Sequence, residues 1–466
     1  MPPNIKFGTD GWRGLIADDF TFDNVAKVAQ ATANYFRRQK GIRRGIIVGY
    51  DARFLSREFA EKTAEVLANA GIHVKLADSI VSTPMVSLAI KKLKTAGAVI
   101  ITASHNPAQY NGFKIRSDFA GPAHPEQIAE VERELRIVLR QKNHKPRKPL
   151  SRLLEEGTVE TVNLRKIYLD DIKRKVDLGA IKRSGLRILY DAMYGAGQGV
   201  LQQLVPNVSA MHNDFNPSFG GNRPEPMAEH VLELREQVRK GRFNIGLATD
   251  GDADRVGAVD EKGNFVDSHR MFAVLLKYFV EVKHLKGEVA KSLSVTQMIN
   301  KMCKKYGLTL HETPVGFKHL CKLMVERDIL IAGEESGGLG VRGHVPERDG
   351  ILVGLLLCEI MVARKKSLSA LVQELFKQYG EYYFDRIDLR ITESDKRRIM
   401  SKFNKSITEV AGEKVVRIRD IDGYQYFVNG GWLLVRPSGT EPLIRFYAEA
   451  DKANKMKRLL HFATHL

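Results

Sequence analysis

The stretch that decides the fold is residues 45–107, GIIVGYDARFLSREFAEKTAEVLANAGIHVKLADSIVSTPMVSLAIKKLKTAGAVIITASHNP, in which strand signals and helix signals alternate. Short apolar runs have the length and the residue types of buried strands, and they cover residues 45–49, 72–77 and 98–102. Amphipathic segments with helical spacing separate these runs, at residues 57–70 and 84–96. Strands separated by helices predict a largely parallel sheet covered on both faces.

The same pattern returns further along the chain. Residues 186–191, LRILYD, resemble residues 46–51, IIVGYD, because each is a strand that ends in Tyr-Asp and leads towards a helix. This echo predicts a repeated α/β unit, and a third unit is expected over residues 263–379. Beyond that point the pattern changes to alternating strands with two helices, which predicts a small α+β domain with antiparallel strands.

Composition limits the kinds of partner that this protein can have. A formal net charge of +18 over 466 residues implies anionic partners. The basic runs contain few aromatic residues for base stacking, so we expect no nucleic-acid groove and favour a basic surface or a cleft for phosphorylated sugars. Apolar residues make up 43% of the chain and charged residues 27%, as in ordinary globular proteins.

Cysteine usage and hydropathy predict a cytoplasmic protein. Cys303, Cys321 and Cys358 lack metal-ligand spacing and are interpreted as reduced thiols. The N-terminus has no apolar core of a signal peptide. The longest apolar run, residues 351–363, is interrupted by Glu359 and is too short to span a bilayer, so we expect a buried helix there and no membrane association.

The segment DGDADR, residues 250–255, carries carboxylates at every second position: Asp250, Asp252 and Asp254. Alternate side chains of an extended backbone share a face, so these carboxylates can converge on one hard cation. An EF-hand loop is excluded, because Arg255 stands where that loop needs glycine and because the flanks are strand-like. A solvated acidic turn is disfavoured, since uncompensated carboxylates at the end of a buried strand are costly. We therefore predict a metal site.

Two other short segments could supply a nucleophile and an acid or base. TASHNP, residues 102–107, follows an apolar strand and could project Ser104 into a cleft, although Ser-His-Asn-Pro alone is more often an ordinary turn. The segment lacks the Gly-x-Ser-x-Gly elbow of α/β-hydrolases. NGFK, residues 111–114, ends in Lys114, which could act as an acid or base or be a surface lysine.

Three glycine-containing segments complete the set. GTDGWRG, residues 8–14, surrounds Arg13 with glycines but does not fit a dinucleotide-binding fingerprint. GEESGG, residues 333–338, offers acceptors suited to sugar hydroxyls, or it is simply a polar loop. RPSGTEP, residues 436–442, could surround a phosphate dianion with an arginine and two hydroxyls, or form a tight turn between two strands.

Taken together, the six segments resemble the α-D-phosphohexomutase superfamily, the phosphoglucomutases and phosphomannomutases, and they occur in the expected order along the whole chain. The resemblance implies three similar α/β domains and a smaller C-terminal α+β domain around a central cleft. We place these domains at residues 1–150, 151–260, 261–378 and 379–466. Mg²⁺ is the implied metal, a hexose 1,6-bisphosphate the implied activator, and a phosphorylated hexose the implied substrate, with the chain a monomer or a weak homo-oligomer.

The resemblance also implies a role for each residue of the six segments. Ser104 would be the phosphoserine, and its phosphate oxygen would hold the metal together with Asp250, Asp252 and Asp254. The groups around the transferring phosphoryl would be Lys114 as acid or base, Arg13, His105 and Arg255. Sugar hydroxyls would be bound by Glu334 and Ser336, and the phosphate that is not reacting would be bound by Arg436, Ser438, Gly439 and Thr440. Further substrate contacts would come from Lys291, His344 and Arg348.

Substrate identity is harder to read from the sequence. GEES resembles phosphoglucomutases more than the GEMS of dual-specificity phosphomannomutases or the GEQS of phosphoglucosamine mutases, so glucose 1-phosphate is favoured. Many relatives continue with Gly-His where this chain has Gly337 and Gly338, which leaves one sugar contact open. The alternatives are a phosphomannomutase or dual-specificity mutase, a glucose 1,6-bisphosphate synthase or phosphatase that uses the same serine, and a non-catalytic binder of phosphosugars or nucleic acid.

Overall fold

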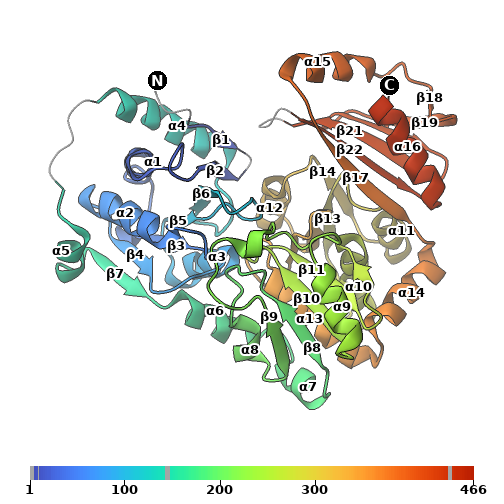
Figure 1. Ribbon diagram of the computed structural model, residues 1–466, viewed down its shortest axis with the longest axis horizontal. Coiled ribbons are helices and arrows are strands. Elements are labelled where there is room, and N and C mark those ends of the chain that lie inside the picture. Colours follow the sequence, from blue (N-terminus) through green and yellow to red (C-terminus); the bar gives the residue numbers. More distant parts are fainter. Residues whose placement is uncertain (1–4, 9, 142–146, 439–442, 466) are drawn as a thin grey trace.

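The chain forms four successive domains, each built on its own sheet, as Figure 1 shows for the computed structural model. The structure describes residues 5–8, 10–141, 147–438 and 443–465. The predicted architecture, three α/β domains followed by a smaller α+β domain, is confirmed. Among the described residues, none of the helices combines the length and the apolar character that crossing a bilayer needs.

Domain I contains a seven-stranded sheet in the order β1-β2-β6-β5-β3-β4-β7. The strands are β1 (Phe7–Gly8), β2 (Gly11–Leu15), β3 (Ile46–Tyr50), β4 (Val74–Ala77), β5 (Gly97–Ile101), β6 (Tyr110–Ser117) and β7 (Val159–Val162). The helices are α1 (Phe22–Phe36), α2 (Ser56–Asn69), α3 (Thr83–Leu93), α4 (Pro125–Arg140) and α5 (Leu150–Glu155). The predicted strands and helices of residues 45–102 are all present, with ends shifted by a few residues.

The first sheet differs from the prediction in two ways. It is mixed, because β5 and β6 are joined by a short loop and therefore pair antiparallel, whereas β3, β4, β5 and β7 are parallel. It also extends beyond the boundary expected at residue 150, since β7 pairs with β4 as the last strand of the sheet. The linker expected at residues 141–152 lies partly outside the described residues, and α5 begins within it.

Domain II follows, with a five-stranded sheet in the order β12-β11-β10-β8-β9. Its strands are β8 (Ile188–Asp191), β9 (Val208–Met211), β10 (Ile245–Thr249), β11 (Val256–Asp260) and β12 (Phe265–Val266). Its helices are α6 (Leu164–Ile172), α7 (Leu178–Arg183), α8 (Val200–Leu204) and α9 (Leu232–Lys240).

Domain III has a four-stranded sheet in the order β14-β13-β15-β16. Its strands are β13 (Glu288–Ser292), β14 (Leu310–Thr313), β15 (Ile329–Gly333) and β16 (Leu339–Val341). Its helices are α10 (Ser268–Glu281), α11 (Gln297–Tyr306), α12 (Phe317–Glu326), α13 (Gly350–Arg364) and α14 (Leu368–Tyr379). Helix α13 is the buried apolar helix that the run at residues 351–363 predicts.

One arrangement is common to the first three domains. Each has a central strand (β3, β8 or β13) with a parallel neighbour on both sides, and one of these neighbours pairs antiparallel with the next strand of the chain. The antiparallel pairs are β5–β6, β10–β11 and β15–β16. The predicted repeat is therefore confirmed, since the two Tyr-Asp sequences end the equivalent strands β3 and β8. The loop of each antiparallel pair contains one predicted motif, TASHNP, DGDADR or GEESGG.

Domain IV is an antiparallel six-stranded sheet in the order β17-β22-β21-β20-β19-β18. Its strands are β17 (Tyr383–Arg390), β18 (Glu409–Val410), β19 (Glu413–Arg419), β20 (Tyr424–Val428), β21 (Gly431–Pro437) and β22 (Leu443–Ala450). Its helices are α15 (Glu393–Lys402) and α16 (Ala453–His465), and the core under α16 is separate from the large core shared by the other domains. The domain lies beside domain III (Figure 1).

Candidate active site

The three aspartates of DGDADR converge at one point. They lie in the loop between β10 and β11, are fully buried, and bring carboxylate oxygens within 4.8 Å of one another. Gly251 allows the neighbouring loop of domain I to approach, because a Cβ at this position would lie 2.4 Å from the Ser104 carbonyl oxygen. The structure therefore places the acidic loop directly against the serine loop.

The aspartate cluster has the chemistry of a cation site. Burial and the carboxylates of Asp254 and Asp252 raise the pKa of Asp250 well above its ordinary value. Within the described part of the chain, Asp252 Oδ1 and Asp254 Oδ1 are buried and have no hydrogen-bond partner. Three oxygen donors that repel one another, two of them with unused lone pairs, fit a hard divalent cation.

Ser104 lies next to this cluster. Its hydroxyl donates a hydrogen bond to Asp250 Oδ2 at 2.9 Å, and the residue is 2% exposed with a backbone φ of 53°. His105 Nδ1 is 3.3 Å from the same hydroxyl oxygen. Burial, Arg255 and Arg13 lower the pKa of His105 well below its ordinary value, so its imidazole is neutral at pH 7. Arg13, on β2, donates from Nη1 to Asn106 Oδ1 at 2.6 Å and so borders the serine loop.

Lys114 reaches the site from β6, where it lies opposite Ile100 of β5. Its Nζ is 2.8 Å from Asp252 Oδ2 and 2.9 Å from Asp10 Oδ2. Burial alone lowers the pKa of this lysine, but the carboxylates of Asp10, Asp252 and Asp254 outweigh burial and raise it above the ordinary value. Lys114 is therefore a buried ammonium at neutral pH, held beside the aspartate cluster.

Two further arginines border the aspartates. The backbone N–H of Arg255 donates to Asp250 Oδ1 at 3.0 Å, and its guanidinium is 3.0 Å from Glu225. Arg348 connects two loops, since its Nη2 is 2.5 Å from Asp254 Oδ2 and its Nη1 is 3.6 Å from Glu334 Oε2. A Cβ at Gly338 would lie 2.2 Å from Arg348 Cδ. The arginine stem thus fills the space beside the glycine that follows Gly337.

The GEESGG loop leaves β15 and faces this arginine. Glu334 is buried and accepts a hydrogen bond from the backbone N–H of Gly316 at 2.8 Å. Burial raises the pKa of Glu334 to about 7, and Arg348 offsets only part of that effect. Ser336 is partly exposed in the same loop. The loop therefore offers one buried carboxyl and one accessible hydroxyl.

The raised pKa of Glu334 predicts a pH-dependent stability effect. The carboxyl titrates near 4.5 in the unfolded chain and near 7 in the folded protein, so the folded state binds more protons between these values and loses stability as pH rises through them. Above pH 7 the free energy of unfolding is lower by on the order of 3 kcal/mol. Relative to the wild type, the melting temperature of E334Q should therefore increase from pH 5 to pH 8, as measured by calorimetry. A difference that is the same at both pH values contradicts the assignment.

Two of the expected substrate contacts have other surroundings. His344 is buried, its Nε2 is 2.9 Å from Asp349 Oδ2, and Asp349 caps the start of α13. The substrate contact expected of His344 stays a prediction, and in this structure its ring contacts the residue that caps α13. Lys291 is fully buried on β13 and donates to the carbonyl oxygens of Val295 and Thr296 at 2.8 and 3.1 Å.

The RPSGTEP segment lies on domain IV, apart from the aspartate cluster. Arg436 ends β21, with its Nε 2.6 Å from Asp422 Oδ2. The backbone N–H of Ser438 donates to the Leu443 carbonyl at 2.9 Å, which closes the base of the loop. Gly439 and Thr440 lie outside the described residues. The described part therefore has the arginine and the serine that the prediction requires at the mouth of a loop.

Sequence reasoning missed the residues that position these groups. Arg53 is fully buried and its guanidinium donates to four carbonyl oxygens of the serine loop, those of Ser104, Asn106, Pro107 and Tyr110, at 2.6 to 2.9 Å. Thr83 donates from Oγ1 to Asp252 Oδ2 at 2.5 Å, and Asp10 holds Lys114 from the other side. Only Asp10 lies in a motif that the sequence singles out, GTDGWRG.

Comparisons with known proteins agree with this geometry. Residues 4–139, 166–263, 267–379 and 389–465 match, in order, the phosphoglucomutase/phosphomannomutase alpha/beta/alpha domains I, II and III and the C-terminal domain. A phosphoglucosamine mutase of Carboxydothermus hydrogenoformans is 32% identical over 96% of this chain and 95% of its own length. A phosphoglucomutase/phosphomannomutase of Thermococcus kodakarensis is 28% identical, covering 99% of this chain and 98% of its own.

A solved structure is similar over the whole chain. The crystal structure of a candidate phosphomannomutase from Thermus thermophilus superimposes with a TM-score of 0.86 at 31% identity, and it covers 100% of this chain and 99% of its own. The domain matches, the full-length relatives and this structure agree with the convergence of the three motif loops. The chain therefore belongs to the phosphoglucomutase/phosphomannomutase family, within the α-D-phosphohexomutase superfamily.

Proposed function

We propose that this protein is a Mg²⁺-dependent phosphohexomutase that moves a phosphoryl group between O1 and O6 of a hexose, through a phosphorylated Ser104 and a hexose 1,6-bisphosphate. The observation that carries the proposal is the hydrogen bond from the Ser104 hydroxyl to Asp250 Oδ2, within a cluster of three converging carboxylates. A buried serine beside such a cluster has few uses other than holding a phosphoryl group, because a hydroxyl alone gains little from three adjacent carboxylates.

The proposed cation would be held by Asp250, Asp252 and Asp254 together with a phosphate oxygen on Ser104. When bound, Mg²⁺ offsets the negative charge of the transferring phosphoryl group. The chain supplies further positive charge at the same place, since the guanidinium groups of Arg13 and Arg255 lie close enough to His105 to lower its pKa. Positioning and electrostatic stabilisation are thus the main contributions of the protein.

Lys114 is proposed as the proton carrier. As the phosphoryl group leaves Ser104 Oγ for a sugar hydroxyl, that hydroxyl loses a proton and Oγ must gain one. Lys114 is a buried ammonium that pairs with Asp252. Asp252 belongs to the same carboxylate cluster as Asp250, which accepts the hydrogen bond from the serine hydroxyl. It can therefore give a proton to the serine side and recover one from the sugar side, without water entering the site.

Glu334 and Ser336 are proposed to bind sugar hydroxyls, and Arg436 with Ser438, Gly439 and Thr440 to bind the phosphate that is not reacting. The bisphosphate must present each of its ends to Ser104 in turn, so one clamp on domain IV has to accept either phosphate. This requirement explains a clamp built from general phosphate ligands, an arginine and hydroxyls, with no feature specific to one sugar carbon.

The preferred sugar is proposed to be glucose, on the basis of the GEES sequence at residues 333–336. The relatives carry names for glucose, mannose and glucosamine phosphates, so the test compares all three. With Mg²⁺ and a trace of glucose 1,6-bisphosphate, kcat/KM should be highest for glucose 1-phosphate. A higher value for mannose 1-phosphate or glucosamine 1-phosphate reassigns the sugar, and net release of inorganic phosphate instead of 6-phosphate rejects the mutase assignment.

A further inference from the structure

One carboxylate oxygen of domain IV contacts both domain III and the arginine of the RPSGTEP segment. Asp422 lies in the turn between β19 and β20, and its Oδ2 accepts two hydrogen bonds. One comes from Arg436 Nε at 2.6 Å, and the other from the backbone N–H of Val315 at 3.0 Å. Val315 belongs to the domain III loop between β14 and α12. The arginine of the phosphate clamp and this domain III loop therefore share one acceptor.

The contact continues into the GEESGG loop, residues 333–338, and from there into the DGDADR loop, residues 250–255. The next residue of the domain III loop, Gly316, donates its backbone N–H to Glu334 Oε1 at 2.8 Å. The other carboxylate oxygen of Glu334 lies 3.6 Å from Arg348, which contacts Asp254 at 2.5 Å. Asp422 is thus the link through which the clamp arginine is connected with the sugar-binding glutamate and, beyond it, with the aspartate cluster.

The Asp422 turn moves with the clamp. Gly423 has a φ of +81°, and a Cβ there would lie 2.1 Å from the carbonyl oxygen of Val435 on β21, the strand that carries Arg436. The turn and the clamp strand are therefore packed backbone to backbone as one unit. A displacement that separates this turn from the domain III loop stretches the bond from Asp422 to Val315, while the bond from Asp422 to Arg436 is kept.

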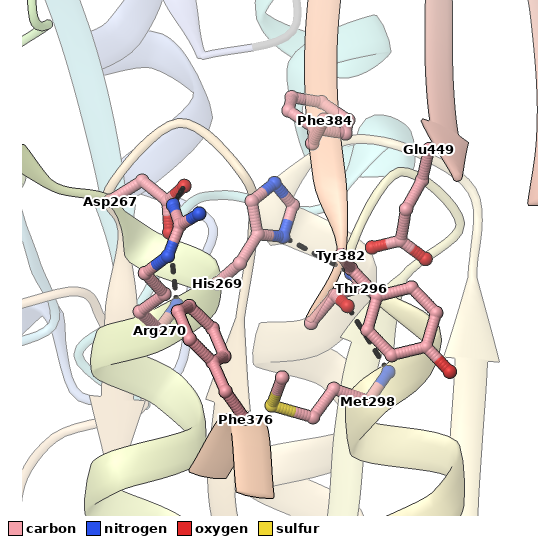
Figure 2. A pocket seen from close by; sticks show the side chains of 9 residues that line it. All are labelled: Asp267, His269, Arg270, Thr296, Met298, Phe376, Tyr382, Phe384 and Glu449. Carbon is pink, nitrogen blue, oxygen red and sulfur yellow. Dashed lines mark hydrogen bonds and ion pairs between the residues drawn. The ribbon is translucent and has the colours of Figure 1, made fainter. Parts of the chain in front are cut away.

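A second contact between domains III and IV lies where the chain passes from one domain to the other. The chain crosses once, at residues 380–382, and nearby Phe384 packs on His269 with ring centroids 4.3 Å apart. Figure 2 shows the small pocket that Tyr382, Phe384 and His269 line together with Glu449 and Arg270. Its volume of about 10 Å³ holds about one water molecule, so neither a sugar nor a phosphate fits. The junction is therefore closely packed where the chain crosses.

We propose that Asp422 is a positioning residue that sets the distance between the phosphate clamp and the sugar loop, and so retains the bisphosphate intermediate while its two ends exchange. The inference rests on the proposed mutase function. A bisphosphate held at both ends must detach its reacting phosphate to turn round, and at that moment the clamp alone keeps it on the protein. A clamp arginine that loses its orientation relative to Glu334 holds the intermediate less well.

The test compares D422N with D420N. Asn keeps the size of the side chain but removes the charge that Arg436 contacts. Asp420 lies in the same turn, and its side chain pairs with Lys405 at 2.5 Å on the surface of domain IV, so D420N is a matched control. D422N should release about ten times more glucose 1,6-bisphosphate into solution per turnover, and should need about ten times more of it as activator. D420N should behave as the wild type.

The two kinetic constants separate positioning from a general structural effect. In D422N, KM should rise, whereas kcat at saturating bisphosphate should stay within about twofold of the wild type, because Asp422 contacts none of the reacting groups. D422E restores the charge with one more methylene and should rescue only part of the effect. If D422N releases no more bisphosphate than D420N while the wild type turns over, the inference about Asp422 is wrong and the proposed function stands. A wild type without mutase turnover overturns the proposed function and this inference with it.

Discussion

Replacing Ser104 with alanine is expected to lower mutase activity by at least about three orders of magnitude, because the variant has no oxygen to receive the phosphoryl group. The substitution removes one hydroxyl, whose described contacts are Asp250 and His105, so the fold should be unaffected. The measurement is conversion of glucose 1-phosphate to glucose 6-phosphate at saturating Mg²⁺ and bisphosphate, together with the melting temperature of each protein.

S87A is the matched control for this substitution. Ser87 lies on α3 in the same domain, is fully buried, and has a hydroxyl without a hydrogen-bond partner among the described residues. Removing that hydroxyl should leave both activity and melting temperature close to those of the wild type. Full activity in S104A would exclude the mechanism, and an equal loss in S87A would assign the effect to packing instead.

Replacing Asp252 with asparagine is expected to weaken Mg²⁺ binding by at least about tenfold and mutase activity by at least about a hundredfold. Asp252 can serve two groups, since its buried Oδ1 has no hydrogen-bond partner among the described residues and its Oδ2 accepts from Lys114 at 2.8 Å. Burial raises the pKa of Asp252, but Lys114 together with hydrogen bonds to Thr83 and Asp250 outweighs burial and holds that pKa below its ordinary value. An amide loses both the charge that a cation needs and the ion pair that orients the lysine.

Calorimetric titration with Mg²⁺ measures this effect independently of turnover. D177N is the control, because Asp177 caps α7 in the same domain through a hydrogen bond from Ala180, and asparagine caps helices equally well. D177N should bind Mg²⁺ with the affinity of the wild type. Unchanged Mg²⁺ affinity in D252N would show that the cation is held elsewhere.

The fold could be predicted from the sequence because its signals are local. Apolar runs between glycine and polar residues gave the strands of residues 45–102, and the structure has each of them. The motif loops were found for the same reason, since DGDADR and TASHNP each follow such a strand. The direction of β6 was missed, because it depends on the tight loop after Ser104 and on pairing with β2 on its other side.

The supporting residues could not be predicted, because their roles arise from long-range contacts. Arg53 lies more than fifty positions before the carbonyl oxygens that it binds, and in sequence it is one of many arginines. Asp422 lies over a hundred positions from Val315. The contact of His344 with Asp349 at the start of α13 was likewise not predicted.

The most direct test of the account is to locate the phosphoryl group on the protein. After incubation with glucose 1,6-bisphosphate and Mg²⁺, peptide mass mapping should find one added phosphoryl group, on Ser104, in a chain whose aspartate loop is intact. Addition of excess glucose 6-phosphate should then remove it and yield bisphosphate. A phosphoryl group on another residue, or rapid turnover by a chain that never carries one on Ser104, would contradict the account.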